Sequence, residues 1–202
     1  MPKLTPAVQT ARREHILDAA EVCFARNGFH RTTMSDICRE AEVSAGALYV
    51  YFESKEALIA GIAERDRSKF LSELEALATA SDLTTALTQL GEHYAVEEPQ
   101  HKRKLCIEIG IEATRNPVVG EIYHAVDNLV LDGFEQLFRR AIEEGRIRPA
   151  FDPRTLAETI CMIGDGIFWR RGTDPQFDAK RLMPAITVIV NNLLNPQPQH
   201  DA

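Results

Sequence analysis

Hydrophobic residues recur every three or four positions along almost the whole chain of 202 residues, and no segment alternates as a β-strand would. In residues 10–26 they form one face of a helix, which ends at the left-handed C-cap signal Asn27-Gly28. The same spacing, with the positions of Pro, Gly and capping residues, predicts further helices near 33–40, 44–51, 54–78, 82–98, 100–115, 117–144, 153–172 and 178–194. The pattern therefore predicts an all-α protein.

Residues 32–58 contain two very short predicted helices followed at once by a longer one. Thr33 with Asp36 three residues later is a capping pattern, and Ser44 is a good N-cap for the second helix. Ser54 caps the third helix, where Lys55 stands beside free backbone N–H groups that suit a phosphate. Two short helices joined by a tight turn are typical of a helix-turn-helix DNA reader. The competing interpretation is a helical hairpin with no role in DNA binding.

The order and spacing of these residues resemble the DNA-binding signature of the TetR family of bacterial transcriptional regulators. The similarity runs through Thr33, the turn before Ser44, the Leu-Tyr-Val-Tyr-Phe string at 48–52 and Ser-Lys-Glu-Ala-Leu at 54–58. Cys38 stands where the family usually has Ala, which exchanges one small buried residue for another. Glu42 stands where the family usually has Gly, and only Gly adopts φ > 0 there without strain. Glu42 also adds a negative charge close to where DNA would lie.

The resemblance assigns particular side chains to DNA. It implies base-edge contacts from Ser35, Ala45, Gly46 and Tyr49, and phosphate contacts from Thr33, Ser44, Tyr51 and Lys55. These base readers lack the Arg or Gln that forms bidentate contacts. Specificity is therefore expected to depend on Tyr49, on apolar contact with thymine methyl groups and on DNA shape.

The resemblance also implies a domain organisation. Residues 1–53 are expected to form the helix-turn-helix DNA-binding domain, residues 54–195 a helical effector-binding and dimerisation domain, and residues 196–202 a disordered tail. The last two predicted helices are apolar on more than one face, as in a four-helix interface between two copies. The predicted interface residues are Ile160, Ile163, Ile167, Phe168, Ile186, Ile189, Val190 and Leu193. The alternative is that both helices belong to the interior of a monomer.

The larger domain carries no strong motif, but polar groups stand among apolar ones in its central helices. A pocket with apolar walls and a few polar anchors suits a small organic ligand. The candidate effector contacts are His93, Tyr94, Glu108, Glu112, Tyr123, His124, Asp127, Asp165 and Trp169. Each residue also has an ordinary structural interpretation. The histidines could lie on the surface, or in the core with their hydrogen bonds made within the protein. Glu108 and Glu112 could form a solvated acidic face, and Trp169 could be a core residue.

Charge and composition are consistent with a DNA reader at one end of the chain. The net charge is −7, yet positive and negative residues balance over residues 1–55, so the excess of acids lies in the remainder. The four cysteines are scattered among apolar residues, as expected of reduced thiols in the cytosol. The N-terminus has no signal-peptide core, and no apolar run is long enough to span a bilayer. A cytoplasmic protein is expected.

An enzyme is disfavoured. The sequence has no Gly-x-Ser-x-Gly, phosphate-binding glycine loop or His-Glu-x-x-His, and no serine follows Ser81. The six histidines lack close metal-ligand spacing, and neither a metal site nor a cofactor is expected. Together with the resemblance to the TetR family, these observations predict a ligand-responsive, homodimeric DNA-binding regulator, most simply a repressor that binds a palindromic operator and is released by a small organic effector. Two alternatives remain: a metal- or redox-responsive regulator on the same scaffold, and a helical small-molecule-binding protein without DNA specificity.

Overall fold

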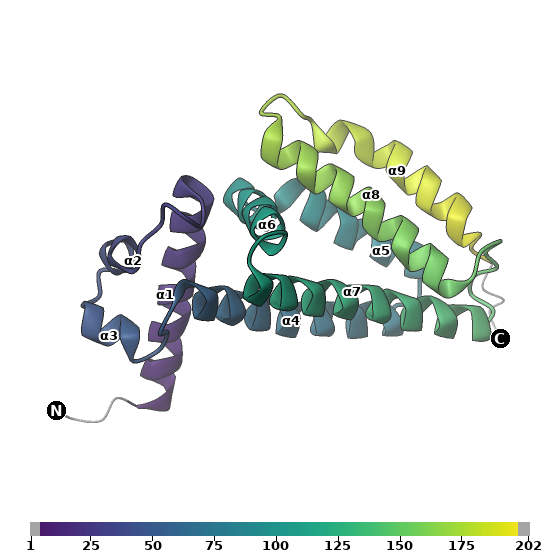
Figure 1. The fold of residues 1–202 in the computed structure, drawn as a ribbon. Coiled ribbons are helices and arrows are strands. Elements are labelled where there is room, and N and C mark those ends of the chain that lie inside the picture. The colour runs from purple at the N-terminus through teal and green to yellow at the C-terminus, as the bar shows by residue number, and fades with distance from the viewer. Residues whose placement is uncertain (1–4, 198–202) are drawn as a thin grey trace. The chain divides into compact units, whose positions relative to one another are not determined.

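The structure, a computed structural model, describes residues 5–197 and confirms the all-α prediction (Figure 1). Short turns and loops separate most of the helices, but the π-helix η1 continues directly from α5. The helices are α1 Pro6–Asn27, α2 Met34–Glu40, α3 Ala45–Tyr49, α4 Lys55–Thr79, α5 Leu83–Glu92, the π-helix η1 His93–Glu97, α6 Gln100–Ala113, α7 Pro117–Glu143, α8 Pro153–Thr173 and α9 Ala179–Leu194. Within residues 5–197 the extended pairing consists of an isolated antiparallel bridge between Ile147 and Pro196.

Most helices begin and end where the sequence predicts. Thr33 and Asp36 form the predicted capping box of α2, and the Ser44 side chain accepts the Ala47 N–H at the start of α3. Gly28 ends α1 with a φ of 79°, a conformation that glycine adopts without steric cost. Pro184, expected to kink or delay the last helix, lies inside α9.

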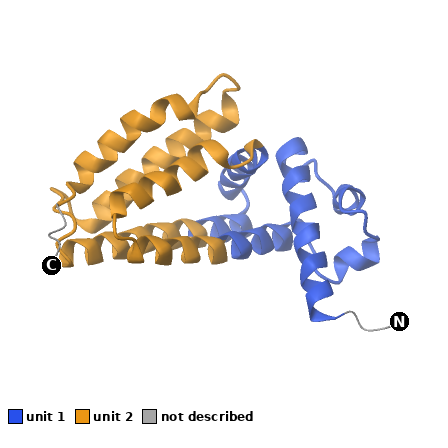
Figure 2. Ribbon diagram, turned by 180° about the vertical axis from the view of Figure 1, so that it is seen from behind, with its two compact units in different colours: residues 1–66, 101–124 blue, residues 67–100, 125–202 orange. Residues whose placement is uncertain are grey.

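The chain divides into two compact units, and the division differs from the predicted domain boundary (Figure 2). Unit 1 comprises residues 1–66 and 101–124, and unit 2 comprises residues 67–100 and 125–202. The sequence places the boundary at residue 53/54. The structure instead assigns the first half of α4, nearly all of α6 and the start of α7 to the unit that contains the helix-turn-helix.

Unit 1 packs α1, α2 and α3 around a core to which α4, α6 and α7 also contribute. The buried core side chains include Ile16, Leu17, Phe24, Ile37, Leu48, Leu58, Ile59, Leu105 and Val119. The backbone of α4 lies very close to the neighbouring side chains at Gly61. A Cβ at this position would lie 2.8 Å from the Phe52 ring and 2.9 Å from Leu17. Gly61 is therefore required for this close packing.

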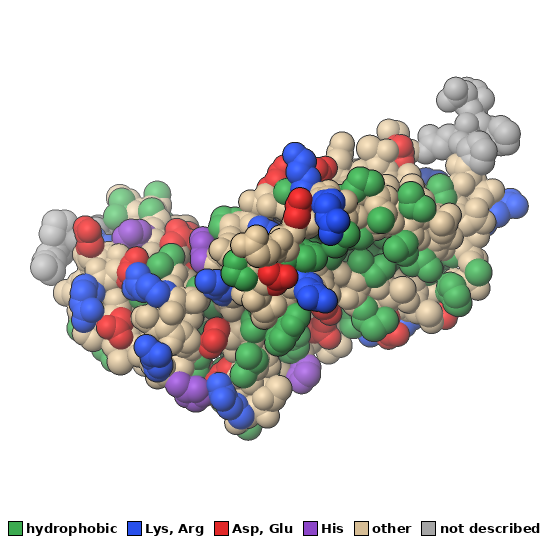
Figure 3. All heavy atoms as spheres, turned by 90° about the horizontal axis from the view of Figure 1, so that it is seen from above, with side chains coloured by type: hydrophobic (Ala, Val, Ile, Leu, Met, Phe, Trp, Pro, Cys, Tyr) green, Lys and Arg blue, Asp and Glu red, His purple; other side chains and the backbone are tan. Residues whose placement is uncertain are grey.

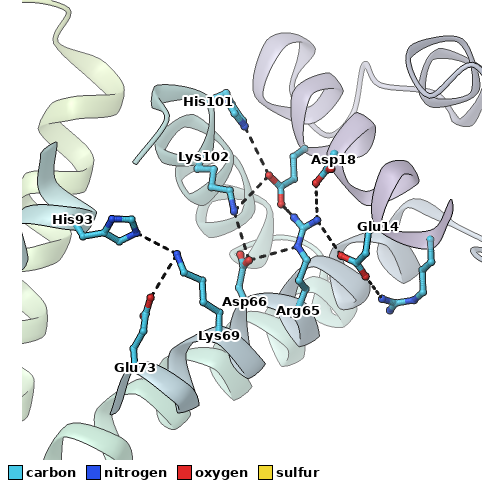
Figure 4. Close-up of polar contacts among 11 residues, drawn as sticks. Glu14, Asp18, Arg65, Asp66, Lys69, Glu73, His93, His101 and Lys102 are labelled. Atoms are coloured by element: carbon cyan, nitrogen blue, oxygen red, sulfur yellow. Dashed lines mark hydrogen bonds and ion pairs between the residues drawn. The ribbon is translucent and has the colours of Figure 1, made fainter. Parts of the chain in front are cut away.

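An ionic cluster fastens three helices of unit 1 to one another (Figure 4). The Arg65 guanidinium on α4 contacts the Asp18 carboxylate at 2.8 Å and also pairs with Glu21, and both acids lie on α1. From α6, Lys102 lies 3.8 Å and His101 3.9 Å from the Glu21 carboxylate. Because only 3% of the Glu21 side chain is exposed, this buried charge depends on its cationic neighbours.

Unit 2 has a separate core formed by α5, α8, α9 and parts of α4 and α7. Phe134 and Phe138 on α7 stack with ring centroids 5.8 Å apart, as expected of core residues. Pro196 and Gln197, predicted to begin a disordered tail, pair with the segment after α7, and the Gln197 N–H donates to the Arg146 carbonyl at 2.9 Å. The remaining tail residues, 198–202, lie outside the described part of the chain.

Candidate DNA interface and effector region

The α2–turn–α3 segment presents a polar surface assembled from short side chains. Leu48 and Ile37 are fully buried and hold α3 and α2 to the core. This packing leaves the opposite side of α3 free, and Ala45 and Gly46 are exposed there. Nothing lies within 4 Å of where a Gly46 Cβ would be, so the backbone of α3 is accessible at this point.

Six of the eight predicted DNA contacts are exposed together on these short elements. They are Thr33, Ser35, Ser44, Ala45, Gly46 and Tyr49. The Tyr49 side chain, 54% exposed, is the largest of them. Tyr51 is partly buried and packs against the core of unit 1, so only part of its surface is available to a ligand.

Lys55, predicted to contact a DNA phosphate, is already bound to other groups of the protein. Its Nζ donates to the Phe29 carbonyl at 2.6 Å and lies 4.3 Å from the centroid of the Phe29 ring. The ammonium group is therefore bound to the α1–α2 turn in this structure. Contact with a phosphate would require the side chain to share or leave these partners.

Glu42 occupies the turn between α2 and α3 with a φ of 51°. This is the left-handed conformation that Gly, the usual residue of the family at this position, adopts without strain. A side chain with a Cβ is strained there by about 1 kcal/mol relative to glycine. Glu42 also places an exposed, negatively charged carboxylate at this turn. The two disadvantages, strain and charge, can be separated experimentally.

The structure separates the predicted effector contacts into groups. In unit 2, His93 and Tyr94 of η1 come together with α4. The Tyr94 hydroxyl donates to Glu73 at 2.5 Å. Lys69 Nζ donates to His93 Nε2 at 3.2 Å (Figure 4). Arg171 of α8 donates to the carbonyls of Tyr94 and Glu98 at the end of this π-helix, at 3.2 and 2.9 Å. π-Helical turns often occur at functional sites.

A second group in unit 2 joins α7 and α8. Partial burial of the carboxyl group and the charge of Asp127 raise the pKa of Asp165, although part of this residue remains exposed. Burial, together with Asp165, raises the pKa of the neighbouring Cys161 thiol to about 12. Trp169 on α8 is 54% exposed, so the alternative interpretation as a core residue is wrong.

The remaining candidates lie in unit 1. The ring centroids of Tyr123 and His124 are 5.7 Å apart, and both side chains are exposed. Glu108 and Glu112 instead contact the α1–α2 turn: Glu108 accepts the Phe29 N–H at 3.2 Å, and Glu112 lies 2.8 Å from His30. Because Glu112 is buried, the alternative of a solvated acidic face is wrong for this residue.

A hollow in unit 2 lies away from all of these residues. It has a volume of about 470 Å³ and is lined by Ser81, Asp82, Leu83, Thr84, Arg146, Ile147, Pro196 and Gln197. None of the predicted effector contacts lines it.

Known proteins share both the local pattern and the whole fold. The model of the bacterial regulatory proteins of the tetR family matches residues 16–62. The transcriptional regulator UidR of Escherichia coli K12 is 33% identical over 159 residues, which cover 77% of this chain and 79% of UidR.

The chain belongs to the TetR family.

Solved structures of TetR-type regulators agree over the full length. Salmonella enterica GusR superposes with a TM-score of 0.79 at 28% identity, covering 96% of this chain and 99% of GusR. The complex of SmeT with triclosan superposes with a TM-score of 0.76 at 29% identity, covering 95% and 100% of the two chains. This TetR-family chain is therefore a DNA-binding transcriptional regulator with an N-terminal helix-turn-helix and a helical C-terminal part.

The exposed apolar surface of α8 and α9 differs in detail from the predicted dimer face. Ile160, Val190 and Leu193, predicted at the interface, pack against the core of unit 2, whereas Ile189 is 50% exposed. Met162, Trp169 and Val188, which the sequence prediction omitted, are 65%, 54% and 59% exposed. Figure 3 shows hydrophobic side chains gathered on this side of the unit. Because both helices carry apolar residues on more than one face, the sequence did not show which stripe points outward.

The predicted DNA contacts of this TetR-family protein also omit one exposed residue at the end of α3. Val50, at the C-terminal end of α3, is 78% exposed and stands between the two predicted DNA contacts Tyr49 and Tyr51. An apolar β-branched side chain gains nothing from this exposure in the free protein. Its place in the string that follows Leu48 is the signal that could have identified it.

Proposed function

We propose that the protein is a dimeric repressor that binds a palindromic operator and is released from it by a small organic effector. The observation that carries the proposal is the exposed face of α3, where Ala45, Gly46 and Tyr49 stand clear of the core. A helix with such small residues can approach base edges closely, and Tyr49 supplies a ring and a hydroxyl for recognition.

Dimerisation is part of the same proposal. The exposed apolar stripe of α8 and α9 is suited to a second copy of the chain. One five-residue recognition helix spans few bases, whereas two related by a twofold axis would read half-sites about one DNA turn apart.

The effector is proposed to contact unit 2 near η1 and α8. The support is the group formed by His93, Tyr94 and Arg171 around the π-helix, with apolar α8 beside it. SmeT has been solved with triclosan, a small organic molecule, and this supports the same class of effector here. No segment of residues 5–197 is a helix long and apolar enough to cross a membrane, and a cytoplasmic regulator is proposed.

The metal- and redox-responsive alternatives receive less support. Among the described residues, no three His, Cys, Asp or Glu side chains converge as metal ligands would. A redox sensor requires a reactive thiolate. Burial raises the pKa of both Cys23 and Cys161, and this leaves the exposed Cys106 as the cysteine most open to oxidation.

The proposal is tested by selecting duplexes from a random DNA pool and titrating the best one by fluorescence anisotropy against a scrambled sequence. We expect selective binding that weakens steeply with salt, because phosphate contacts release counterions. Compounds that release the DNA would then be titrated with and without saturating operator. Operator and effector must weaken each other by the same factor. Equal binding to both DNAs would contradict the DNA proposal, and effector affinity unchanged by operator would contradict the release mechanism.

A further inference from the structure

Three residues between α1 and α2, Gly28, Phe29 and His30, are held by two helices that connect unit 1 to unit 2 along the chain. One is α4, whose second half lies in unit 2, and the other is α6, which follows η1 of unit 2 in the chain. The contacts described here all lie within unit 1. We call residues 28–30 the joint.

The carboxylates of α6 bind the joint at two successive residues. Glu108 accepts the Phe29 N–H, and it also lies so close to Gly28 that a Cβ there would be 3.1 Å from its Oε2. One turn later, Glu112 lies 2.8 Å from His30 Nε2 and accepts the Arg115 Nε–H at 2.9 Å. Two acids at i,i+4 on one helix thus face one short loop.

Glu112 is unusual for an acid in a helix exposed to solvent on its other side. Its relative exposure is 1%, whereas 61% of the His30 side chain remains exposed. A buried carboxylate is costly unless donors satisfy it, and here the donors are His30 and Arg115. The burial of Glu112 therefore depends on the position of the joint.

α4 binds the joint from its own N-terminus. Lys55 Nζ donates to the Phe29 carbonyl at 2.6 Å and lies over the Phe29 ring. Both the amide and the carbonyl of Phe29 are consequently fixed by side chains, one from α6 and one from α4. A shift of either helix changes the hydrogen bonding of the same residue.

The joint in turn determines where α2 begins. The Thr32 hydroxyl donates to the Gly28 carbonyl at 2.8 Å and to the Cys23 carbonyl at 3.1 Å, and this side chain is buried. The next residue, Thr33, caps α2 and is itself a predicted phosphate contact. A movement of the joint would therefore also move Thr33, the first residue of the DNA-reading segment.

From these contacts we infer that Glu112 and Glu108 are positioning residues for DNA binding, which act through the joint and do not contact DNA or effector themselves. This inference rests on the proposed function, since it assumes sequence-selective DNA binding. Both acids, which the sequence suggested as effector contacts, are thereby inferred to hold the α2–turn–α3 segment in position instead. A change at α6 is expected to reach α2 through residues 28–30.

The test compares Glu112→Gln, His30→Ala and the double variant with the wild-type protein, using the selected operator and a scrambled duplex. Gln keeps the size of the side chain but removes the charge that favours its two donors. We expect Glu112→Gln to lower operator affinity by about tenfold and affinity for scrambled DNA by less than about twofold, because non-specific binding depends on phosphate contacts. The double variant should match the single variants, because both changes remove the same contact.

Two controls separate positioning from a loss of stability. Glu158→Gln removes an exposed ion pair with Arg154 in unit 2 and should leave both affinities unchanged. Glu108→Gln is the milder variant if Glu112→Gln does not fold, and it should reduce selectivity in the same direction. Circular dichroism at the assay temperature establishes that each variant is folded.

The outcomes are distinct. Unchanged operator affinity in folded Glu112→Gln and Glu108→Gln would overturn the inference, as would equal losses on operator and scrambled DNA. Additive losses in the double variant would show that Glu112 does not act through His30 and would also overturn it. If the wild-type protein itself shows no selectivity, the proposed function fails first, and that result is seen before any variant is measured.

Discussion

The two units use their polar residues differently. In unit 1, buried or partly buried polar groups connect separate helices: Glu21 joins α1 to Arg65 of α4, and Glu112 joins α6 to His30. In unit 2, Arg171 also joins α8 to the carbonyls of η1, but ion pairs such as Arg154 with Glu158 are largely exposed. Large apolar side chains including Met162 and Val188 face outward there. Unit 1 is thus organised to keep a surface in one geometry, and unit 2 offers surface to other molecules.

The largest effect is expected from the outward face of unit 2. Replacing both Val188 and Ile189 by Asp places two charges in the proposed dimer interface. We expect a monomer in sedimentation velocity and an operator affinity lower by about 100-fold, because the two half-sites are no longer bound together. Val118→Asp changes a comparably exposed valine of unit 1, at 53%, and should leave the dimer intact. Dimers that persist in the double variant would show that this stripe is not the interface.

The close packing of unit 1 gives the next largest effect. Gly61→Ala introduces a Cβ within 3 Å of both Phe52 and Leu17, two buried side chains. We expect a loss of about 1–3 kcal/mol in the free energy of unfolding, measured by urea denaturation. Gly46→Ala is the matched control, because its Cβ would enter open space. Equal stabilities of the two variants would mean that α4 can move away from α1 at little cost.

Tyr49 tests whether the exposed face of α3 reads bases. Tyr49→Ala removes a side chain that is 54% exposed, so the fold should be retained while operator affinity falls by at least about tenfold. Tyr49→Phe keeps the ring and isolates the hydroxyl group. Anisotropy titrations of both variants on operator and scrambled DNA give the comparison. Operator affinity equal to that of the wild type in Tyr49→Ala would remove Tyr49 from the reading surface.

Glu42 provides a smaller effect of opposite sign. Glu42→Gly relieves the positive φ and removes a negative charge, so we expect a gain of about 1 kcal/mol in stability and tighter DNA binding. Glu42→Gln removes only the charge and should improve DNA binding without the gain in stability. A Gly variant no more stable than the Gln variant would show that the turn is not strained.

The smallest effect is expected at Asp165 in unit 2. Because burial and Asp127 raise its pKa in the folded protein, ionisation at neutral pH opposes folding. Asp165→Asn should therefore raise the melting temperature at pH 7. The gain should decline as the pH falls through the raised pKa and vanish below the ordinary value of 3.8. A pH-independent gain would indicate that the carboxyl group ionises normally.

The α2–turn–α3 segment could be predicted closely from the sequence, because the residues that determine its conformation are neighbours in the chain. The capping box of Thr33 with Asp36 and the Ser44 cap of α3 both follow from residues a few positions apart. The family resemblance was also concentrated in this segment, and the similarity extends over 77% of the chain with UidR and 96% with GusR.

The contacts of Glu112 and the outward stripe of α8 and α9 could not be predicted in the same way. Glu112 meets His30 across 82 positions of the sequence, and no local pattern encodes such a pairing. α8 and α9 carry apolar residues on several faces, so periodicity alone did not distinguish Ile160, which packs inward, from Met162, which is exposed. Both features depend on tertiary packing.

The most direct test of the account is the mass and selectivity of the complex with selected DNA. Native mass spectrometry of the operator complex, with the scrambled duplex and a single half-site alongside, measures both. We expect a palindromic operator with half-sites about one DNA turn apart, bound by two protomers, and much weaker binding to the other two duplexes. One protomer per operator, or equal occupancy of operator and scrambled DNA, would contradict this expectation.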